Sequence, residues 1–306
     1  MERLLRYVPD VSLATLIGLP WPVKKTLAQI DMAARSLSDI EIRSSFLPDA
    51  RYLQKYRTPE CQHFGPVWQY WHSGVTECPP IIRECMASVK RHTTGREVII
   101  LSDHTLHDHV TLPAHILAKR LQMGTTHFSD ILRSYLLAQH GGTWIDASVM
   151  LTGAIDEVIS SLPFFVFKRP NDPYMLSSWF IHSIAGHPLV CAMRDVLTAY
   201  WVMQDELRAY FTFHFFFEAI ITLHADLREH WKKMPAMSAM PPHFLQNALL
   251  AGSNFEQLQE ICRSTPVHKL SYKFPEPVRA EAERIAMWAS MYRQADLVGE
   301  RETKTR

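Results

Sequence analysis

The chain has 306 residues, of which 47% are hydrophobic and 21% charged, fractions typical of a globular protein with a sizeable buried core. Its 32 lysines and arginines nearly balance 31 aspartates and glutamates, so no overall charge attracts nucleic acid, and any phosphate site must be local. The five cysteines include no C-x-x-C pair, which argues against a disulfide framework or a zinc knuckle.

The first part of the chain, residues 1–62, has apolar residues at helical spacing and predicts an accessory helical segment. Its uncharged stretch 11–23 contains two prolines and is shorter than the ~18 residues of a membrane span. Acidic residues precede this stretch and no small-residue cleavage site follows it, so it does not resemble a signal peptide. We therefore expect a cytoplasmic protein, with peripheral association with the inner face of the membrane as the alternative.

A strand, a helix and a second strand are predicted next. The aromatic and β-branched run 66–71 lies between turn residues, which is typical of a buried strand. Pro79 and Pro80 precede a helical pattern that stops at 94–95, and the apolar run 97–101 predicts a second strand. A strand–helix–strand unit predicts a parallel sheet and hence an α/β fold.

The segment 129–152 has the clearest pattern in the chain. Ser129 suits the N-cap of a helix, and Gly141 suits its C-cap. Asp130 and Arg133 are three residues apart, so they share one face of this predicted helix. A surface ion pair is the alternative interpretation of these two residues.

A strand over 143–146 is predicted after two glycines, which allow backbone and ligand to approach closely. Side chains alternate along a strand, so Trp144, Asp146 and, where the chain stays extended, Ser148 face one side. Asp146 then lies at the carboxyl end of a strand, where open α/β sheets bind ligands. A carboxylate there can hold Mn²⁺ or Mg²⁺, which prefer oxygen ligands and share them with substrate phosphates.

The remainder predicts a strand over 162–167, an aromatic helical core over 188–231, and a helix with a charged tail over 276–306. His214 and Glu218 are four residues apart on one helical face, so they could line an acceptor cleft as well as belong to the core.

Three motifs together resemble those of a known family. S-D-x-x-R at 129–133 and G-G-x-W-x-D-x-S at 141–148 are similar to the D-x-D donor-sugar motif of capsular polysaccharide synthesis proteins related to glycosyltransferase family 32. The run PVWQYWHSG at 66–74 resembles that family's first strand. The resemblance covers residues 64–200. It implies a GT-A fold, a Rossmann-type mixed sheet flanked by helices, in a domain over 63–275.

The resemblance also implies roles for the motif residues. Asp130 and Arg133 would hold sugar hydroxyls, and Trp144 would lie against the sugar or the ribose. Asp146 would bind the metal or the ribose. Ser148 stands where the second acid of D-x-D is expected, so it would be a weaker, neutral metal ligand.

The first strand would lie beneath the nucleotide base and line its pocket with Trp68, Gln69 and Trp71. A later patch, 267–273, would complete the metal site with His268. Lys269 or Lys273 would neutralise the departing diphosphate, because a positioned cation stabilises developing charge.

The implied function is that of a glycosyltransferase, retaining and assisted by Mn²⁺ or Mg²⁺, which moves a hexose from a nucleotide-diphosphate sugar to a polysaccharide or another glycan. A UDP-sugar is preferred over a GDP-sugar as the donor. One alternative is a nucleotide-sugar or glycan-binding protein of the same fold with weak catalysis, for which Ser148 would be the mark. Another is a membrane-surface scaffold that recruits its partners through 1–62. The segment 103–109, rich in His and Asp, is interpreted as a solvated loop, since its spacing matches no closed zinc pattern.

Overall fold

The computed structural model of the chain describes residues 65–93, 95–155, 157–169, 176–207 and 210–303. The predicted accessory segment 1–62 lies outside these residues, so its helices stay a prediction.

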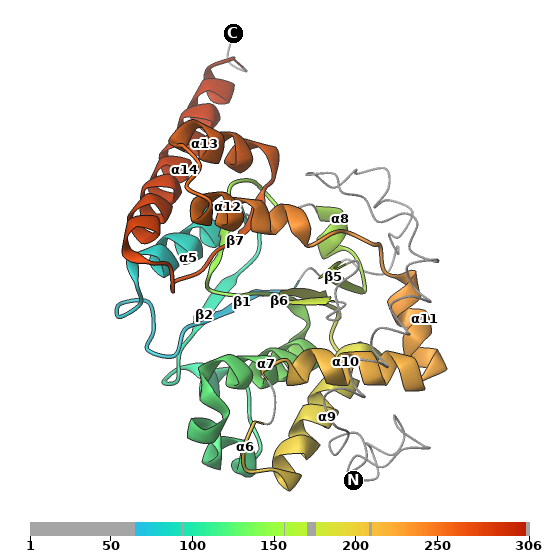
Figure 1. Ribbon diagram of the computed structural model, residues 1–306. Helices are drawn as coiled ribbons and strands as arrows, with labels where there is room; N and C mark the ends of the chain where they lie inside the picture. The colour runs from blue at the N-terminus through green and yellow to red at the C-terminus, as the bar shows by residue number, and fades with distance from the viewer. Residues whose placement is uncertain (1–64, 94, 156, 170–175, 208–209, 304–306) are drawn as a thin grey trace.

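A five-stranded mixed sheet lies at the centre, with its strands in the order β2-β1-β3-β6-β5 (Figure 1). The strands are β1 (Val67–Tyr70), β2 (Val98–Leu101), β3 (Gly142–Ile145), β5 (Phe164–Lys168) and β6 (Leu176–Ser183). β1 is parallel to β2 and to β3, whereas β6 is antiparallel to both β3 and β5. Helix α5 (Pro80–His92) connects β1 to β2, which confirms the predicted strand–helix–strand unit and the mixed α/β class.

Helices cover both faces of the sheet (Figure 1). One face carries α6 (Ala114–Ala118), α7 (Arg120–His140), α9 (Pro188–Met203) and α10 (Thr212–Leu223), with α11 (Ala225–Lys233) beyond them. The other face carries α5, α12 (Met240–Leu250), α13 (Phe255–Ser264) and α14 (Glu276–Thr303). Two further helices are short, η1 (Leu106–Asp108) and α8 (Glu157–Ser160). The aromatic segment after Pro188 is thus helical, as predicted.

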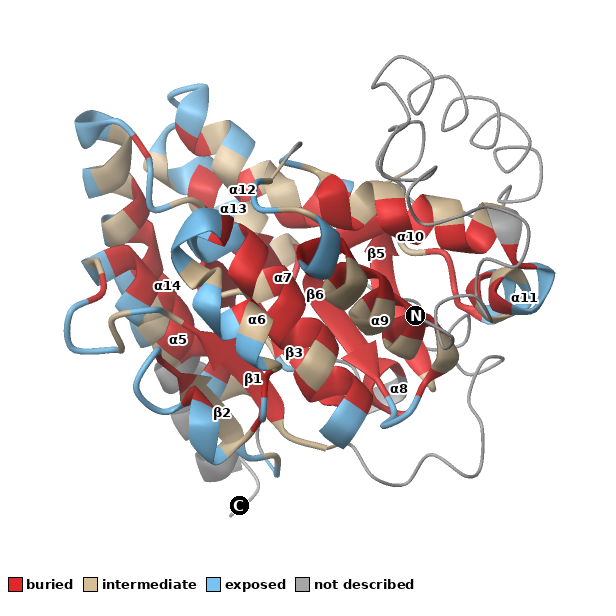
Figure 2. Cartoon of the chain, turned by 90° about the horizontal axis from the view of Figure 1, so that it is seen from below, coloured by how far each residue is buried: buried red, intermediate tan, exposed pale blue. Residues whose placement is uncertain are grey.

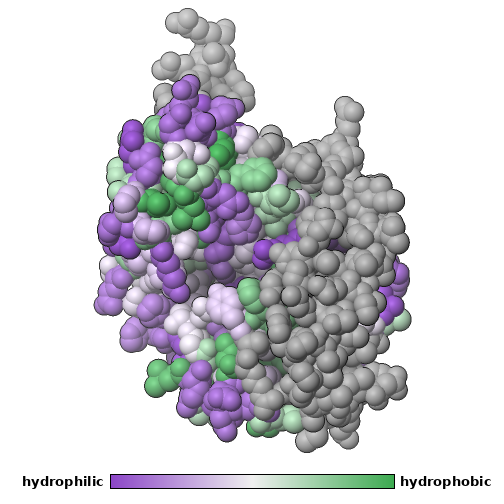
Figure 3. Space-filling model, viewed as in Figure 1, coloured by the Kyte–Doolittle hydropathy of each residue, from purple (hydrophilic) through white to green (hydrophobic). Residues whose placement is uncertain are grey.

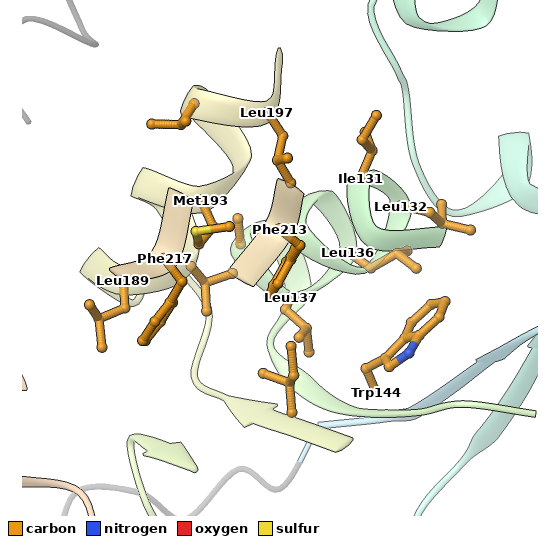
Figure 4. Close-up of a cluster of buried hydrophobic side chains, with 14 of the residues drawn as sticks. Ile131, Leu132, Leu136, Leu137, Trp144, Leu189, Met193, Leu197, Phe213 and Phe217 are labelled. Carbon is orange, nitrogen blue, oxygen red and sulfur yellow. The ribbon is translucent and has the colours of Figure 1, made fainter. Parts of the chain in front are cut away.

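A large apolar core lies between the sheet and α7, α9 and α10 (Figure 4). Figure 4 shows Leu136 and Leu137 of α7 pointing toward the sheet, where Trp144 of β3 lies, and Phe213 and Phe217 of α10 completing the layer. In Figure 2 strands β1, β3, β5 and β6 and the sheet-facing sides of these helices are mostly buried, whereas the edge strand β2 is mostly of intermediate burial. Burial of this much apolar surface fixes α7 against β3 and so fixes the side chains at their ends.

A second core lies on the opposite face, between α5 and the C-terminal helices. Ile82 and Cys85 of α5 pack in one cluster with Leu245 of α12 and with Ala282 and Ile285 of α14. The helix that begins at Glu276 is therefore an integral layer of the folded protein. In the described part of the chain, no helix has the length and apolar character that crossing a bilayer requires.

A short antiparallel ribbon joins distant parts of the chain beside the sheet. β4 (Val149–Leu151) pairs with β7 (Val267–Lys269), and Val149 lies opposite Lys269. Because β4 begins three residues after Asp146, this pairing brings the patch around Lys269 to the carboxyl end of β3.

Helix α7 begins earlier than the sequence predicts. It starts at Arg120 and kinks at Gly124, whose φ is 67°. Ser129 is therefore inside the helix, and its hydroxyl donates to the carbonyl of Thr126 instead of capping an N-terminus. The predicted end is correct, since Gly141 caps the helix with a φ of 66°.

The two glycines at the start of β3 allow neighbouring backbone segments to pack closely. A Cβ on Gly142 would lie 2.2 Å from the carbonyl oxygen of Pro66, and one on Gly141 would lie 2.6 Å from the nitrogen of Ala185. The expectation that these glycines admit a ligand is corrected: they allow β1, β3 and the turn after β6 to approach closely.

Candidate functional site

Asp146 occupies the carboxyl end of β3, as the sequence predicts. Its backbone N–H donates to the carbonyl of Trp179 at 2.9 Å, and its carbonyl accepts from Val149 at 2.9 Å in the turn to β4. The indole Nε1 of Trp144 donates to Oδ1 of Asp146 at 2.8 Å. About a quarter of the side chain is exposed (26%), so the carboxylate is held firmly and still reaches the surface.

Arg133 of α7 lies behind this carboxylate. Its Nη2 is 3.3 Å from Oδ1 of Asp146 and 3.2 Å from Oδ1 of Asp130. Its guanidinium lies over the ring of Trp144, 4.9 Å from the centroid. Only 3% of the side chain is exposed, and further hydrogen bonds to Ser129 and to the carbonyl of Ser178 fix it. Arg133 thus holds both aspartates in place.

Lys269 of β7 approaches Asp146 from the other side. Its Nζ is 3.6 Å from Oδ2 of Asp146 and donates to Oγ of Ser148. The backbone N–H of Leu270 also donates to the carbonyl of Ser148, at 2.9 Å. The chain does not stay extended after Asp146, so Ser148 joins the site through a turn and through Lys269.

The charges around Asp146 keep it ionised. Burial by itself would raise the pKa of the carboxyl, but Arg133 and Lys269 outweigh it, and the hydrogen bond from Trp144 adds to their effect. The net result is a pKa below the usual value, so Asp146 is an anion between two cations at neutral pH.

Asp130, Arg133 and Trp144 are more buried than a direct sugar contact requires. Their exposed fractions are 5%, 2% and 1%. Their polar groups are directed at one another and at Asp146. The structure therefore brings the four motif residues together, with Asp146 as the member that reaches the surface.

The three residues predicted at the base pocket differ in burial. Trp68 is 2% exposed, and its Nε1 donates to the carbonyl of Gly141 at 2.9 Å, so it is a core residue. Gln69 is fully buried within the sheet, because its four-residue strand is covered on both faces. The prediction that these two side chains line a nucleotide pocket is corrected by their burial.

Trp71, directly after β1, does reach the surface. Its ring meets that of Tyr272 edge to face, with centroids 5.2 Å apart. Nζ of Lys273 lies 5.4 Å from the centroid of Tyr272. These three side chains form an aromatic and basic surface group that combines the end of β1 with the segment after Lys269, at the carboxyl end of the sheet.

His268 points away from the site. It is fully buried, and its Nε2 lies 3.0 Å from Oγ1 of Thr152. Successive residues of a strand face opposite sides, so the register that directs Lys269 at Asp146 directs His268 into the core. Burial lowers the pKa of His268 to about 3. The prediction that His268 completes a metal site is wrong for this reason.

The structure adds residues to the surroundings of the site. Burial lowers the pKa of His214 to about 4, a shift that Asp130 opposes and that Arg169 and Arg133 increase. Burial lowers the pKa of His243 to about 4 as well, and Arg169 and Lys269 act in the same direction. The sequence singled out His214 but neither His243 nor Arg169, because no local pattern distinguishes them.

The ring of His243 meets that of Trp179 edge to face, with centroids 5.7 Å apart. Trp179 is also the residue whose carbonyl accepts from the backbone of Asp146. Helix α12 therefore brings a neutral imidazole to the side of the site opposite α7. In the view of Figure 3, beside the residues drawn in grey, hydrophilic residues lie between apolar groups above and below them.

A divalent metal fits this donor set poorly. Among the residues that the structure describes, no three His, Cys, Asp or Glu side chains gather in a way that could hold a metal ion, and this includes the segment 103–109. Asp146 offers one carboxylate, and its neighbour Ser148 offers a hydroxyl already engaged by Lys269. Mg²⁺ and Mn²⁺ prefer several oxygen ligands.

Comparison with known proteins places the chain in a family. The search of curated proteins finds no match. A solved structure titled PaToxG glycosyltransferase is similar at 12% identity and a TM-score of 0.40, over 87% of this chain and 97% of that one. The family model described as capsular polysaccharide synthesis protein matches residues 24–288, which include every residue of the cluster around Asp146. The chain therefore belongs to the capsular polysaccharide synthesis protein family.

Proposed function

We propose that the protein is a glycosyltransferase that moves a hexose from a nucleotide-diphosphate sugar to a polysaccharide or another glycan. A UDP-sugar is proposed as the donor in preference to a GDP-sugar. The observation that carries this proposal is the arrangement of Asp146 between Arg133 and Lys269 at the carboxyl end of β3. This is the edge at which open α/β sheets bind ligands. Membership of a capsular polysaccharide synthesis family supports the same chemistry.

The donor diphosphate is proposed to lie against Lys269. The ammonium has three N–H donors, and its side chain is 19% exposed, so it can donate to a phosphate oxygen while staying near Asp146. A fixed cation at this position stabilises the negative charge that develops on the leaving diphosphate. The cationic site is local, in agreement with the balanced composition of the chain.

The nucleotide base is proposed to stack on the surface pair Trp71 and Tyr272. Aromatic faces stack any base, and Lys273 beside Tyr272 can reach a ribose or phosphate oxygen. The pair lies at the end of β1, the strand next to β3, so a nucleotide there has its diphosphate within reach of β7.

The transfer is proposed to retain the anomeric configuration. The bond from the anomeric carbon to the leaving phosphate oxygen breaks, and the acceptor oxygen forms the new bond on the same face of the sugar. The departing phosphate takes the proton of the acceptor hydroxyl. Asp146 orients Lys269 and a donor hydroxyl, so its contribution is positioning and electrostatic stabilisation.

The acceptor is proposed to approach between His214 of α10 and His243 of α12, which belong to opposite faces of the sheet and are both affected by the charge of Arg169. Both imidazoles are neutral at pH 7, because burial lowers each pKa to about 4. A neutral imidazole can donate to or accept from a sugar hydroxyl, which suits it to line a glycan site.

The test uses the full chain and a panel of UDP- and GDP-sugars. A donor that binds the folded state raises the melting temperature, by an amount equivalent to about 2.7 kcal/mol at a hundred times its Kd. Release of free UDP or GDP then measures turnover, alone and with glycan acceptors. Binding with no turnover would favour the alternative of a catalytically weak nucleotide-sugar binding protein. If no member of the panel raised the melting temperature, the proposed function would be overturned.

A further inference from the structure

We propose that the ammonium of Lys269 takes the place of a divalent metal in this site, so that the donor nucleotide binds without a metal ion. This inference rests on the proposed function, because it concerns the diphosphate of the proposed donor. It replaces the sequence-based expectation of Mn²⁺ or Mg²⁺ with a residue of the chain itself.

Both oxygens of Asp146 already face hydrogen-bond donors of the chain. Oδ1 accepts from Nε1 of Trp144 at 2.8 Å and lies 3.3 Å from Nη2 of Arg133. Oδ2 lies 3.6 Å from Nζ of Lys269. A metal ion at Oδ1 would have to displace one of its two donors, and a metal ion at Oδ2 would lie directly beside the ammonium of Lys269.

The two cations beside Asp146 would also repel a metal ion. A divalent ion bound to Asp146 would lie close to the charges of Arg133 and Lys269. Arg133 cannot withdraw, because it is 3% exposed and is fixed by hydrogen bonds to Ser129 and Ser178. Like charges at such distances in a partly buried site repel strongly, since water screens them little.

Lys269 contacts both polar residues of the D-A-S sequence at 146–148. Its Nζ lies near the carboxylate of Asp146 and donates to the hydroxyl of Ser148, which are the first and third residues of that sequence. The ammonium thus contacts the same two residues, Asp146 and Ser148, that the sequence predicts as metal ligands. A serine at the third position accepts a hydrogen bond from an ammonium without adding a second negative charge.

The pairing of β4 with β7 keeps the ammonium there. Val149 lies opposite Lys269, and the N–H of Leu270 donates to the carbonyl of Ser148 at 2.9 Å. The effect of Lys269 also extends to its neighbours, since its charge opposes the rise in the pKa of the Cys85 thiol that burial causes. A cation built into this two-stranded ribbon needs no ordering when the donor binds.

The experiment measures the binding of UDP, and in parallel of GDP, to the full chain by isothermal titration calorimetry in excess EDTA and in excess MnCl₂. The wild-type protein should bind one of these nucleotides with the same Kd in both, within about twofold, since its cation is covalently part of the chain. Electron paramagnetic resonance of Mn²⁺ alone should show no ion bound to the wild-type protein.

Variants of Lys269 sharpen the test. K269M should weaken nucleotide binding in EDTA by about tenfold or more, the loss of one charge-assisted hydrogen bond. Mn²⁺ should restore part of that binding, because K269M frees Asp146 and Ser148. K269R should keep metal-free binding. The matched control is K119M. The side chain of Lys119 is 21% exposed, similar to that of Lys269, and its Nζ lies 2.8 Å from a carboxylate oxygen of Asp205. Lys119 lies on the far side of the sheet from Lys269.

Two outcomes would overturn the inference and leave the proposed function standing. In the first, the wild-type protein binds nucleotide only when Mn²⁺ is present. In the second, the wild-type protein binds Mn²⁺ without nucleotide, and D146N does not. A third, no binding of UDP or GDP in either condition, would remove the proposed function and this inference with it. Equal weakening by K119M and K269M would assign the effect to lost stability and so also count against Lys269.

Discussion

The indole N–H of Trp144 donates to the carboxylate of Asp146, two residues further along the same chain, at 2.8 Å. The same indole lies beneath the guanidinium of Arg133, 4.9 Å from its centroid. One buried ring therefore sets the direction of the carboxylate and of the cation behind it. Trp144 acts on the site by holding Asp146, since only 1% of it is exposed.

We expect W144F to lower donor turnover by about tenfold, because it removes one hydrogen bond to Asp146 and keeps an aromatic ring in the core. The matched control is W68F, since Trp68 is similarly buried and its N–H donates to a carbonyl at 2.9 Å. Both variants should lose about 1–2 kcal/mol of stability in urea unfolding, and only W144F should lose turnover. Equal turnover in the two variants would show that the indole has no role beyond packing.

D146N should reduce turnover by about 10²-fold or more, because it removes the charge that holds Lys269 while keeping the shape of the side chain. D195N serves as the control, since Asp195 is a half-buried carboxylate 2.8 Å from Arg194 on α9, away from the site. Circular dichroism should show both variants folded. Wild-type turnover in D146N would mean that the reaction takes place elsewhere.

R133M should destabilise the protein by about 3–5 kcal/mol, because it leaves Asp130 buried without its cation. Asp130 is 5% exposed and lies 3.2 Å from the guanidinium. R133K should retain part of the stability but not the hydrogen bonds to Ser129 and Ser178 together. Urea unfolding gives the measurement. A loss of less than about 1 kcal/mol in R133M would contradict the fixed position that the structure gives to Arg133.

G142A should cost about 3 kcal/mol or more, because the new Cβ would lie 2.2 Å from the carbonyl oxygen of Pro66 at a φ of 97°. G186A separates the effect of the steric clash from that of the backbone conformation. Gly186 has a φ of 72°, and a Cβ added there would meet no atom within 4 Å. G186A should therefore lose only the about 1–2 kcal/mol of stability that the left-handed backbone conformation costs. Thermal or urea unfolding compares them. Equal losses would exclude close packing of β1 against β3 as the reason for the glycine.

Stability should fall as the pH drops below about 6.5. Burial lowers the pKa values of His182, His187 and His268 to about 3. The unfolded chain binds these protons near pH 6.5 and the folded protein does not, so their contribution is complete above pH 6.5 and is lost as the pH falls toward 3. At pH 5 each of these three histidines lowers the free energy of unfolding by about 2 kcal/mol. Urea unfolding at pH 7.5 and pH 5 measures the loss, and H268Q should make it smaller. A stability independent of pH over this range would contradict the burial of these rings as neutral groups.

The elements near the sheet could be predicted from local sequence. Pro79 and Pro80 before an amphipathic run fix the start of α5, and Gly141 fixes the end of α7, because proline and glycine restrict the backbone wherever they stand. The start of α7 could not be predicted in this way. Ser129 is a good cap in isolation, but His127 and Phe128 just before it are buried in the core, so the helix continues through Ser129 back to the kink at Gly124.

The sequence alone determined that Trp144 and Asp146 share one side of a strand and that Asp130 and Arg133 share one face of a helix, since residue periodicity is a local property. Only the tertiary structure decided that Lys269 reaches Asp146 while His268 is buried. The orientation of these two side chains depends on the register between β4 and β7, which are more than a hundred residues apart in the chain. A shift of one residue in this register would exchange the places of Lys269 and His268.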